Sequence, residues 1–210
     1  MLADWSAECG PDDPVLVVPW SDPSPDPGKP VAHFIDLRDN PYDLDHLPEA
    51  AENPPLLQAL RSLNAPRSPV FTAKCDAWPV IVTSSEDTYA QSELAYLHLN
   101  LQQSEEETPV AFASYIDLLS RDRSIFASRH RHEQLLDRIA RRAAALDHPY
   151  AMLEMVLRPA FVDLSGPQEG FSISLYIKAL GHDPETAQSH WATALTDVTA
   201  LLRSKAFALA

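Results

Sequence analysis

Residues 171–202, FSISLYIKALGHDPETAQSHWATALTDVTALL, carry the clearest strand and helix signals of the chain. Apolar and polar residues alternate over the first part of this stretch, which is typical of a strand with one buried face. Asp183, Pro184 and Glu185 then predict a helix start, with Asp183 as N-cap and Pro184 at the first helical position. The apolar stripe that follows repeats at helical spacing and comprises Ala187, Trp191, Leu195, Val198 and Leu202. A strand followed by an amphipathic helix favours an α+β protein.

The residues upstream extend this pattern into a βαββα unit over residues 109–210. Residues 113–119 read as a strand, and residues 125–146 predict a long helix with a buried stripe of His132, Leu135, Leu136, Ile139, Ala143 and Leu146. Residues 152–162 and 171–180 read as two strands joined by the turn Ser165-Gly-Pro-Gln-Glu-Gly. We therefore predict mostly antiparallel sheet with helices packed on one face.

The first half predicts a similar βαββ unit over residues 31–108. Its predicted elements are a strand over 31–37, a short helix opened by Pro54-Pro55, a strand from Val70 to Trp78, and a strand over 95–102 whose pattern also suits a helix. Residues 1–30 hold seven prolines and predict an irregular acidic arm with one short edge strand over 15–20.

The two halves resemble each other, which favours a tandem βαββ pseudo-repeat within one compact domain. Phe34-Ile-Asp-Leu matches Tyr115-Ile-Asp-Leu, and Leu56-Leu57 matches Leu135-Leu136 at nearly the same offset. Identities this short also arise by chance.

Composition excludes several large enzyme classes. With five glycines in 210 residues, the chain has no G-x-G-x-x-G, no P-loop and no G-x-S-x-G, and it also lacks C-x-x-C and H-E-x-x-H motifs. Its two cysteines do not form a disulfide framework, and neither a secretory signal nor a run of 18 apolar residues is present. We expect a soluble cytoplasmic protein that binds no membrane.

The charge is strongly negative and unevenly distributed. Thirty acidic residues oppose sixteen Lys and Arg, a net charge of −14, which argues against binding to nucleic acid. Residues 1–52 carry −10, whereas residues 121–142 carry +4. The basic helix favours an anion, an acidic partner or the chain's own acidic arm, although a solvated helix face has the same pattern. The partner-binding candidates are Arg129, Arg131, Arg138, Arg141 and Arg142.

Alternation in the predicted strands gathers polar residues on one face of the sheet. In the strand from Val70, for example, Thr72, Lys74, Asp76 and Trp78 oppose Phe71, Ala73, Cys75 and Ala77. Such a face suits acid–base chemistry or a polar ligand, although antiparallel sheets commonly leave one charged face in water. The ligand-binding candidates are Asp36, Lys74, Asp76, Asp117, Glu154, Arg158, Tyr176 and Lys178.

The sequence predicts neither a metal nor a cofactor. His130 and His132 lie two residues apart on a predicted helix and so point in different directions. The acidic loop after Asp39 lacks the spacing and the glycine of a calcium-binding EF-hand loop. Neither Cys9 nor Cys75 has the surroundings of a nucleophile.

These observations favour a non-catalytic binding or interaction module with an acidic surface. Self-association is one form of it, because the acidic arm and the basic helix are complementary. An antagonist of a basic enzyme or toxin is another. The alternative is a small hydrolase or isomerase that uses Asp36, Asp117 or Asp76 in a polar cleft, so the sequence leaves open whether the chain is an enzyme.

Overall fold

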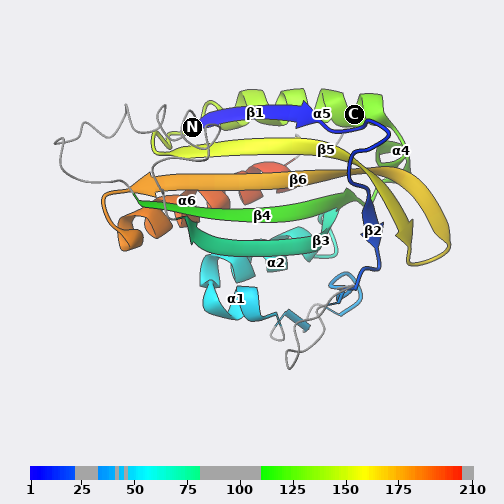
Figure 1. The fold of residues 1–210 in the computed structure, drawn as a ribbon, viewed down its shortest axis with the longest axis horizontal. Coiled ribbons are helices and arrows are strands. Elements are labelled where there is room, and N and C mark those ends of the chain that lie inside the picture. The colour runs from blue at the N-terminus through cyan, green and yellow to red at the C-terminus, as the bar shows by residue number, and fades with distance from the viewer. Residues whose placement is uncertain (22–32, 41–42, 45–46, 81–109, 205–210) are drawn as a thin grey trace.

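A computed structural model of the chain describes residues 1–21, 33–40, 43–44, 47–80 and 110–204. Its centre is a six-stranded sheet with the order β1-β5-β6-β4-β3, in which β2 also pairs with β5 (Figure 1). The strands are β1 (Leu2–Ala7), β2 (Leu16–Val18), β3 (Val70–Val80), β4 (Val110–Ser120), β5 (Ala151–Asp163) and β6 (Pro167–Gly181).

The sheet is mixed rather than mostly antiparallel. The pairs β3–β4, β4–β6 and β5–β6 are antiparallel, in agreement with the predicted antiparallel sheet. The strands β1 and β2, in contrast, both run parallel to β5 and share one edge of it. The described part of the predicted arm, residues 1–21, therefore contributes two strands to the sheet, which corrects the expectation of an irregular segment with one short strand.

The helices are α1 (Pro48–Glu52), α2 (Pro54–Asn64), α4 (Arg123–Phe126), α5 (Arg129–Ala143) and α6 (Pro184–Arg203). Figure 1 shows α2, α5 and α6 behind the sheet, on the predicted single face. Asp183 caps α6, since its carboxylate accepts a hydrogen bond from Thr186 N at 2.7 Å. Within the described ranges, no helix combines the length and apolarity needed to cross a membrane.

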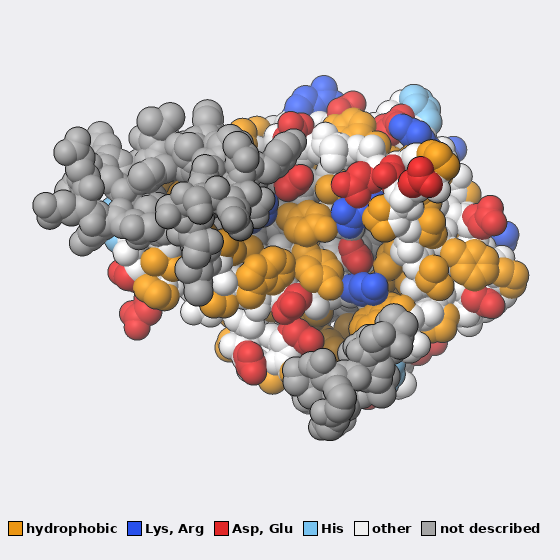
Figure 2. Space-filling view, in the orientation of Figure 1, with side chains coloured by type: hydrophobic (Ala, Val, Ile, Leu, Met, Phe, Trp, Pro, Cys, Tyr) orange, Lys and Arg blue, Asp and Glu red, His pale blue; other side chains and the backbone are white. Residues whose placement is uncertain are grey.

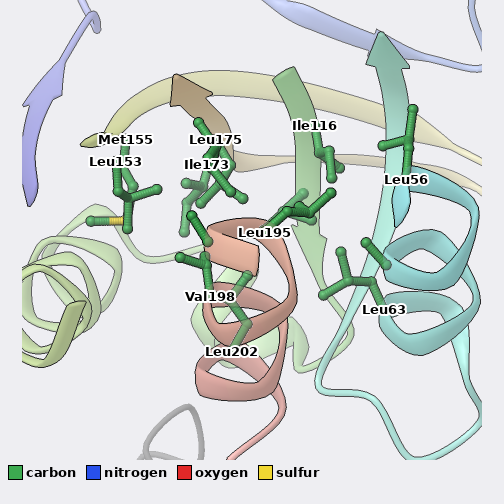
Figure 3. Close-up of a cluster of buried hydrophobic side chains, with 14 of the residues drawn as sticks. Leu56, Leu63, Ile116, Leu153, Met155, Ile173, Leu175, Leu195, Val198 and Leu202 are labelled. Carbon is green, nitrogen blue, oxygen red and sulfur yellow. The ribbon is translucent and has the colours of Figure 1, made fainter. Parts of the chain in front are cut away.

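The main core lies between the sheet and these helices. In Figure 3, Leu56 and Leu63 of α2 and Leu195 of α6 point toward sheet residues such as Ile116 and Met155. Trp191 is fully buried there and donates a hydrogen bond from Nε1 to Ser114 Oγ at 2.8 Å. A second, smaller core lies at one end of the opposite sheet face and comprises Leu16, Val18, Phe71, Ala73, Leu119, Phe126, Ala160 and Val162.

The strand predicted over 31–37 is wrong for residues 33–37, which the structure describes. His33 forms an isolated bridge with Ser21, and the chain then turns at Asp36, whose carboxylate accepts hydrogen bonds from the backbone and the side chain of Arg38. Such local side-chain bonds compete with strand pairing. The strand predicted over 95–102 lies outside the described residues, so the pseudo-repeat stays a prediction.

A β-bulge between Thr72 and Lys74 changes the faces of β3. Phe71 pairs with Leu119, and Lys74 pairs with Asp117, two residues away on β4. Phe71 and Lys74 therefore share one face of the sheet, whereas strict alternation predicts them on opposite faces. From Lys74 to Trp78 the predicted alternation is correct, because Cys75 and Ala77 pack against the main core.

Candidate functional site

The face of the sheet that α2, α5 and α6 leave uncovered displays polar and aromatic side chains. We name as the polar face the side chains of Lys74, Asp76, Trp78, Tyr115, Asp117, Glu154, Arg158, Ser174, Tyr176 and Lys178, which come from β3, β4, β5 and β6. Figure 2 shows acidic and basic side chains gathered near the middle of this face, beside hydrophobic ones.

Asp117 of β4 is the most deeply placed charged residue of the polar face, with 7% of its surface exposed. It lies between Lys74 of β3 and Ser174 of β6 in the strand registers. Ser174 Oγ donates a hydrogen bond to Asp117 Oδ1 at 2.5 Å. Burial raises the pKa of Asp117, and the hydrogen bond from Ser174 and the charges of Lys74 and Arg158 only partly oppose this.

Arg158 of β5 connects the same network to the edge of the sheet. Its Nη1 donates to Ser174 Oγ at 3.0 Å and to Tyr176 Oη at 3.2 Å, and its Nε donates to Glu8 Oε2 at 2.8 Å. Glu8 directly follows β1, so the chain of contacts from Glu8 to Asp117 spans four neighbouring strands. Ser174 connects Arg158 with Asp117 in this chain of contacts, because its hydroxyl accepts a hydrogen bond from Arg158 and donates one to Asp117.

Lys74 is held near Asp117 by the bulge and by Trp20. The Trp20 indole Nε1 donates to the carbonyl of Ala73 at 2.9 Å, and Lys74 Nζ lies 5.0 Å from the centre of the Trp20 ring. This distance is typical of a cation–π contact, which stabilises the ammonium group in place. The segment after β2 thus helps to position a cation of the polar face.

Three aromatic rings form a row across β3, β4 and β6. The ring centres of Trp78 and Tyr115 are 6.1 Å apart, and so are those of Tyr115 and Tyr176. Burial raises the pKa of Tyr115, so its phenol stays neutral at physiological pH. Trp78 is 37% exposed and so offers apolar surface beside the charged groups.

The remaining candidates lie at the margins of this arrangement. Lys178 Nζ is 3.7 Å from Glu154 Oε2, which is an ion pair between β6 and β5. The carboxylate of Asp76, which pairs with Tyr115 in the register, accepts from the backbone N–H of Ala77 at 2.7 Å.

Of the eight predicted ligand-binding residues, Asp36 is the one that lies off the polar face. It belongs to the turn before Arg38, and its Oδ1 accepts from Arg38 Nε at 2.8 Å. That bond is the largest reason why the pKa of Asp36 lies below its ordinary value. The predicted equivalence of Asp36 and Asp117 is therefore wrong.

Five contributors were absent from the predicted set: Trp78, Tyr115 and Ser174 of the polar face, and Glu8 and Trp20, which contact it. Tyr115 and Ser174 follow from the same strand alternation, so the signal was present. Glu8 could not be found, because nothing in the local sequence shows that the parallel strand β1 pairs with β5.

The five predicted partner-binding arginines belong to α5, and several have local partners. Arg129 Nε bonds Glu133 at 2.8 Å, Arg131 Nη1 bonds Ser124 Oγ at 2.6 Å, and Arg141 Nε bonds the carbonyl of Asp137 at 3.2 Å. The other two are Arg138 and Arg142. Such contacts on a helix are those of an ordinary solvated face, and a partner for this helix stays a prediction.

The arrangement suits recognition through fixed polar and aromatic groups. Neither cysteine supplies a thiolate, because burial raises the pKa of Cys75 to about 12 and also raises that of Cys9. Among the described residues, no group of three His, Cys, Asp or Glu side chains could hold a metal ion. Comparison with protein-family models, with curated proteins and with solved structures returned no match.

Proposed function

We propose that the chain is a non-catalytic binding protein and that its polar face contacts a protein partner with a basic surface. The observation that carries this proposal is the network from Glu8 through Arg158 and Ser174 to Asp117, flanked by the row of aromatic rings. Energetically dominant contacts in protein interfaces come mainly from Trp, Tyr and Arg. The polar face presents all three types in one row of neighbouring strands.

The internal hydrogen bonds favour binding because they hold the side chains in place before any partner arrives. Arg158 is oriented by three acceptors, and Lys74 is held over the Trp20 ring. Side chains that are already ordered lose less conformational entropy on association, so a larger part of the contact energy contributes to affinity.

The partner's basic surface follows from the charge of the chain. A net charge of −14 repels acidic surfaces and speeds the encounter with basic ones. Antagonism of a basic enzyme or toxin is one form of such binding, and association with a second copy through the basic helix α5 is another. The proposal includes a cytoplasmic location, which the free thiols of Cys9 and Cys75 support.

The experiment compares quantitative affinity capture by the wild-type chain, by Trp78→Ala and by the control Arg67→Ala, which alters an exposed residue between α2 and β3. We expect the wild type and the control to capture equal amounts of one basic protein. The captured amount should fall about tenfold with Trp78→Ala, and also about tenfold at high salt. Light scattering at two salt concentrations identifies the partner as a second copy if the wild type dimerises and Trp78→Ala does not. Identical capture by all three chains would contradict the proposal.

An enzyme is the second candidate, and the raised pKa of Asp117 favours it. A carboxyl group whose pKa is raised by burial holds its proton more strongly than usual and can act as a general acid or base. Assays with ester, amide and phosphoester substrates should then detect turnover that Asp117→Asn abolishes. Such turnover would replace the binding proposal.

A further inference from the structure

A cavity with three arginines opens at the end of the sheet where β4 leads into α4. Its volume is about 320 Å³, and its wall includes Arg38, Phe71, Arg121, Arg123, Ser165 and Gln168. Among the residues that the structure describes, no Asp or Glu side chain lines this wall. This cavity is separate from the network around Asp117, and the inference drawn from it does not depend on the proposed function.

The guanidinium groups of Arg38 and Arg121 lie over the same aromatic ring. Their Cζ atoms are 4.6 Å and 5.9 Å from the centre of the Phe71 ring. Two cations therefore occupy one small region although they come from distant parts of the chain. Positive charges brought together in this way repel each other, and an anion between them would remove that repulsion.

Both groups are held by their Nε and Nη2 atoms. Arg38 bonds the carboxylate of Asp36 at 2.8 Å and 2.5 Å, and Arg121 bonds the carbonyls of Val70 at 3.1 Å and Asn64 at 3.0 Å. A guanidinium carries five N–H donors, so Nη1 of each arginine keeps donors that these bonds do not use. Asp36 and Asp39 offset two of the three positive charges, which leaves an excess of one at the cavity.

Arg123 and the polar residues of the wall complete the donor set. Arg123 lies on the four-residue helix α4 and is exposed, Ser165 belongs to the turn between β5 and β6, and Gln168 lies at the start of β6. Arginine binds phosphate and carboxylate oxygens through parallel N–H bonds, which are about twice as strong as neutral hydrogen bonds. The cavity volume is at the lower end of the range for small-molecule sites.

We infer that this cavity binds the oxyanion group, phosphate or carboxylate, of a small molecule, with Arg38, Arg121 and Arg123 as its donors. Arg121 both contacts the ligand and ties β3 to α2 through its bonds to Val70 and Asn64. Arg38 keeps its orientation through Asp36, so the site is preformed rather than assembled by the ligand.

Calorimetric titration with inorganic phosphate, and separately with acetate, tests this inference at constant ionic strength. The first variant is Arg123→Gln, because its side chain forms no hydrogen bond with another residue of the described chain and its loss should leave the fold intact. The matched control is Arg142→Gln, which removes the same charge from an exposed position on α5. We expect saturable binding that weakens at least about tenfold in Arg123→Gln and less than about twofold in Arg142→Gln.

A second measurement covers Arg38, whose replacement would leave Asp36 without its partner. Phenylglyoxal labelling of the wild-type chain, read by mass spectrometry, should slow at Arg38 and Arg123 in the presence of phosphate and remain unchanged at Arg142. Binding of phosphate, of acetate or of both supports the inference and identifies the anion chemistry. The inference would be overturned if neither phosphate nor acetate binds saturably, or if Arg123→Gln and Arg142→Gln lose the same amount of anion affinity.

Discussion

Replacement of Arg158 by Met should destabilise the fold mainly through the loss of its bonds to neutral acceptors, not through its ion pair. Methionine keeps the apolar stem packed on β5 and removes the guanidinium. Ser174 is 1% exposed, so its hydroxyl loses a charge-assisted bond that water cannot easily replace, at a cost of about 1.5–2 kcal/mol. Tyr176 is partly exposed and can bond water instead, so its share is below about 1 kcal/mol.

The ion pair between Arg158 and Glu8 contributes little by comparison. The two side chains are 22% and 41% exposed, and pairs of this kind are worth about 0–1 kcal/mol because water screens them. We therefore expect Arg158→Met to lower the free energy of unfolding by about 2–3 kcal/mol and Glu8→Gln by less than about 1 kcal/mol.

Urea unfolding followed by tryptophan fluorescence measures both losses, with Arg142→Met as a charge-matched control that should stay within about 0.5 kcal/mol of wild type. The slope of the free energy against urea should be the same for all variants, since none changes the surface exposed on unfolding. A loss for Arg158→Met no greater than that for Glu8→Gln would refute the reasoning, because the network would then be no more than a surface ion pair.

Three further predictions concern other parts of the fold. Because burial raises the pKa of Asp117, its contribution to stability is complete below its ordinary pKa of about 3.9 and is lost as the pH rises through the raised pKa. Urea unfolding should therefore show Asp117→Asn gaining stability relative to wild type as the pH increases. A stability difference that does not change with pH would contradict this. Gly181→Ala should lower the free energy of unfolding by about 1–3 kcal/mol, and with it the melting temperature, because a Cβ atom would lie 2.3 Å from the backbone nitrogen of Ala187. A melting temperature equal to that of wild type would contradict this. Thiol titration should find Cys75, whose pKa is about 12, unreactive until urea unfolds the chain, and rapid labelling in the folded state would contradict that burial.

The second half of the fold could be predicted because its signals are local. The alternation over residues 171–180 and the N-cap at Asp183 each involve near neighbours in the sequence, and both are confirmed in β6 and α6. The buried stripe of α5, from His132 to Ala143, is confirmed for the same reason. Strand alternation likewise placed Asp117, Arg158 and Tyr176 on one face.

The features that the sequence did not reveal depend on distant or unusual contacts. The pairing of β1 with β5 joins residues about 150 positions apart, and the small residues of β1 form only a weak strand pattern. The opposite error occurred at Phe34-Ile-Asp-Leu, where an apolar strand-like composition was overridden by the bonds from Arg38 to Asp36.

The bulge in β3 gives that strand one residue more than its pairing with β4 uses. It lets Phe71 join the small core while Lys74, Asp76 and Trp78 remain on the polar face. Deletion of Ala73 would leave Phe71 and Lys74 two positions apart, so they would still share one face of a regular strand. Deletion of Cys75 would instead make Lys74 and Asp76 direct neighbours and so place them on opposite faces. Loss of Ala73 should therefore be tolerated better than loss of Cys75, although both changes shorten the strand by one residue.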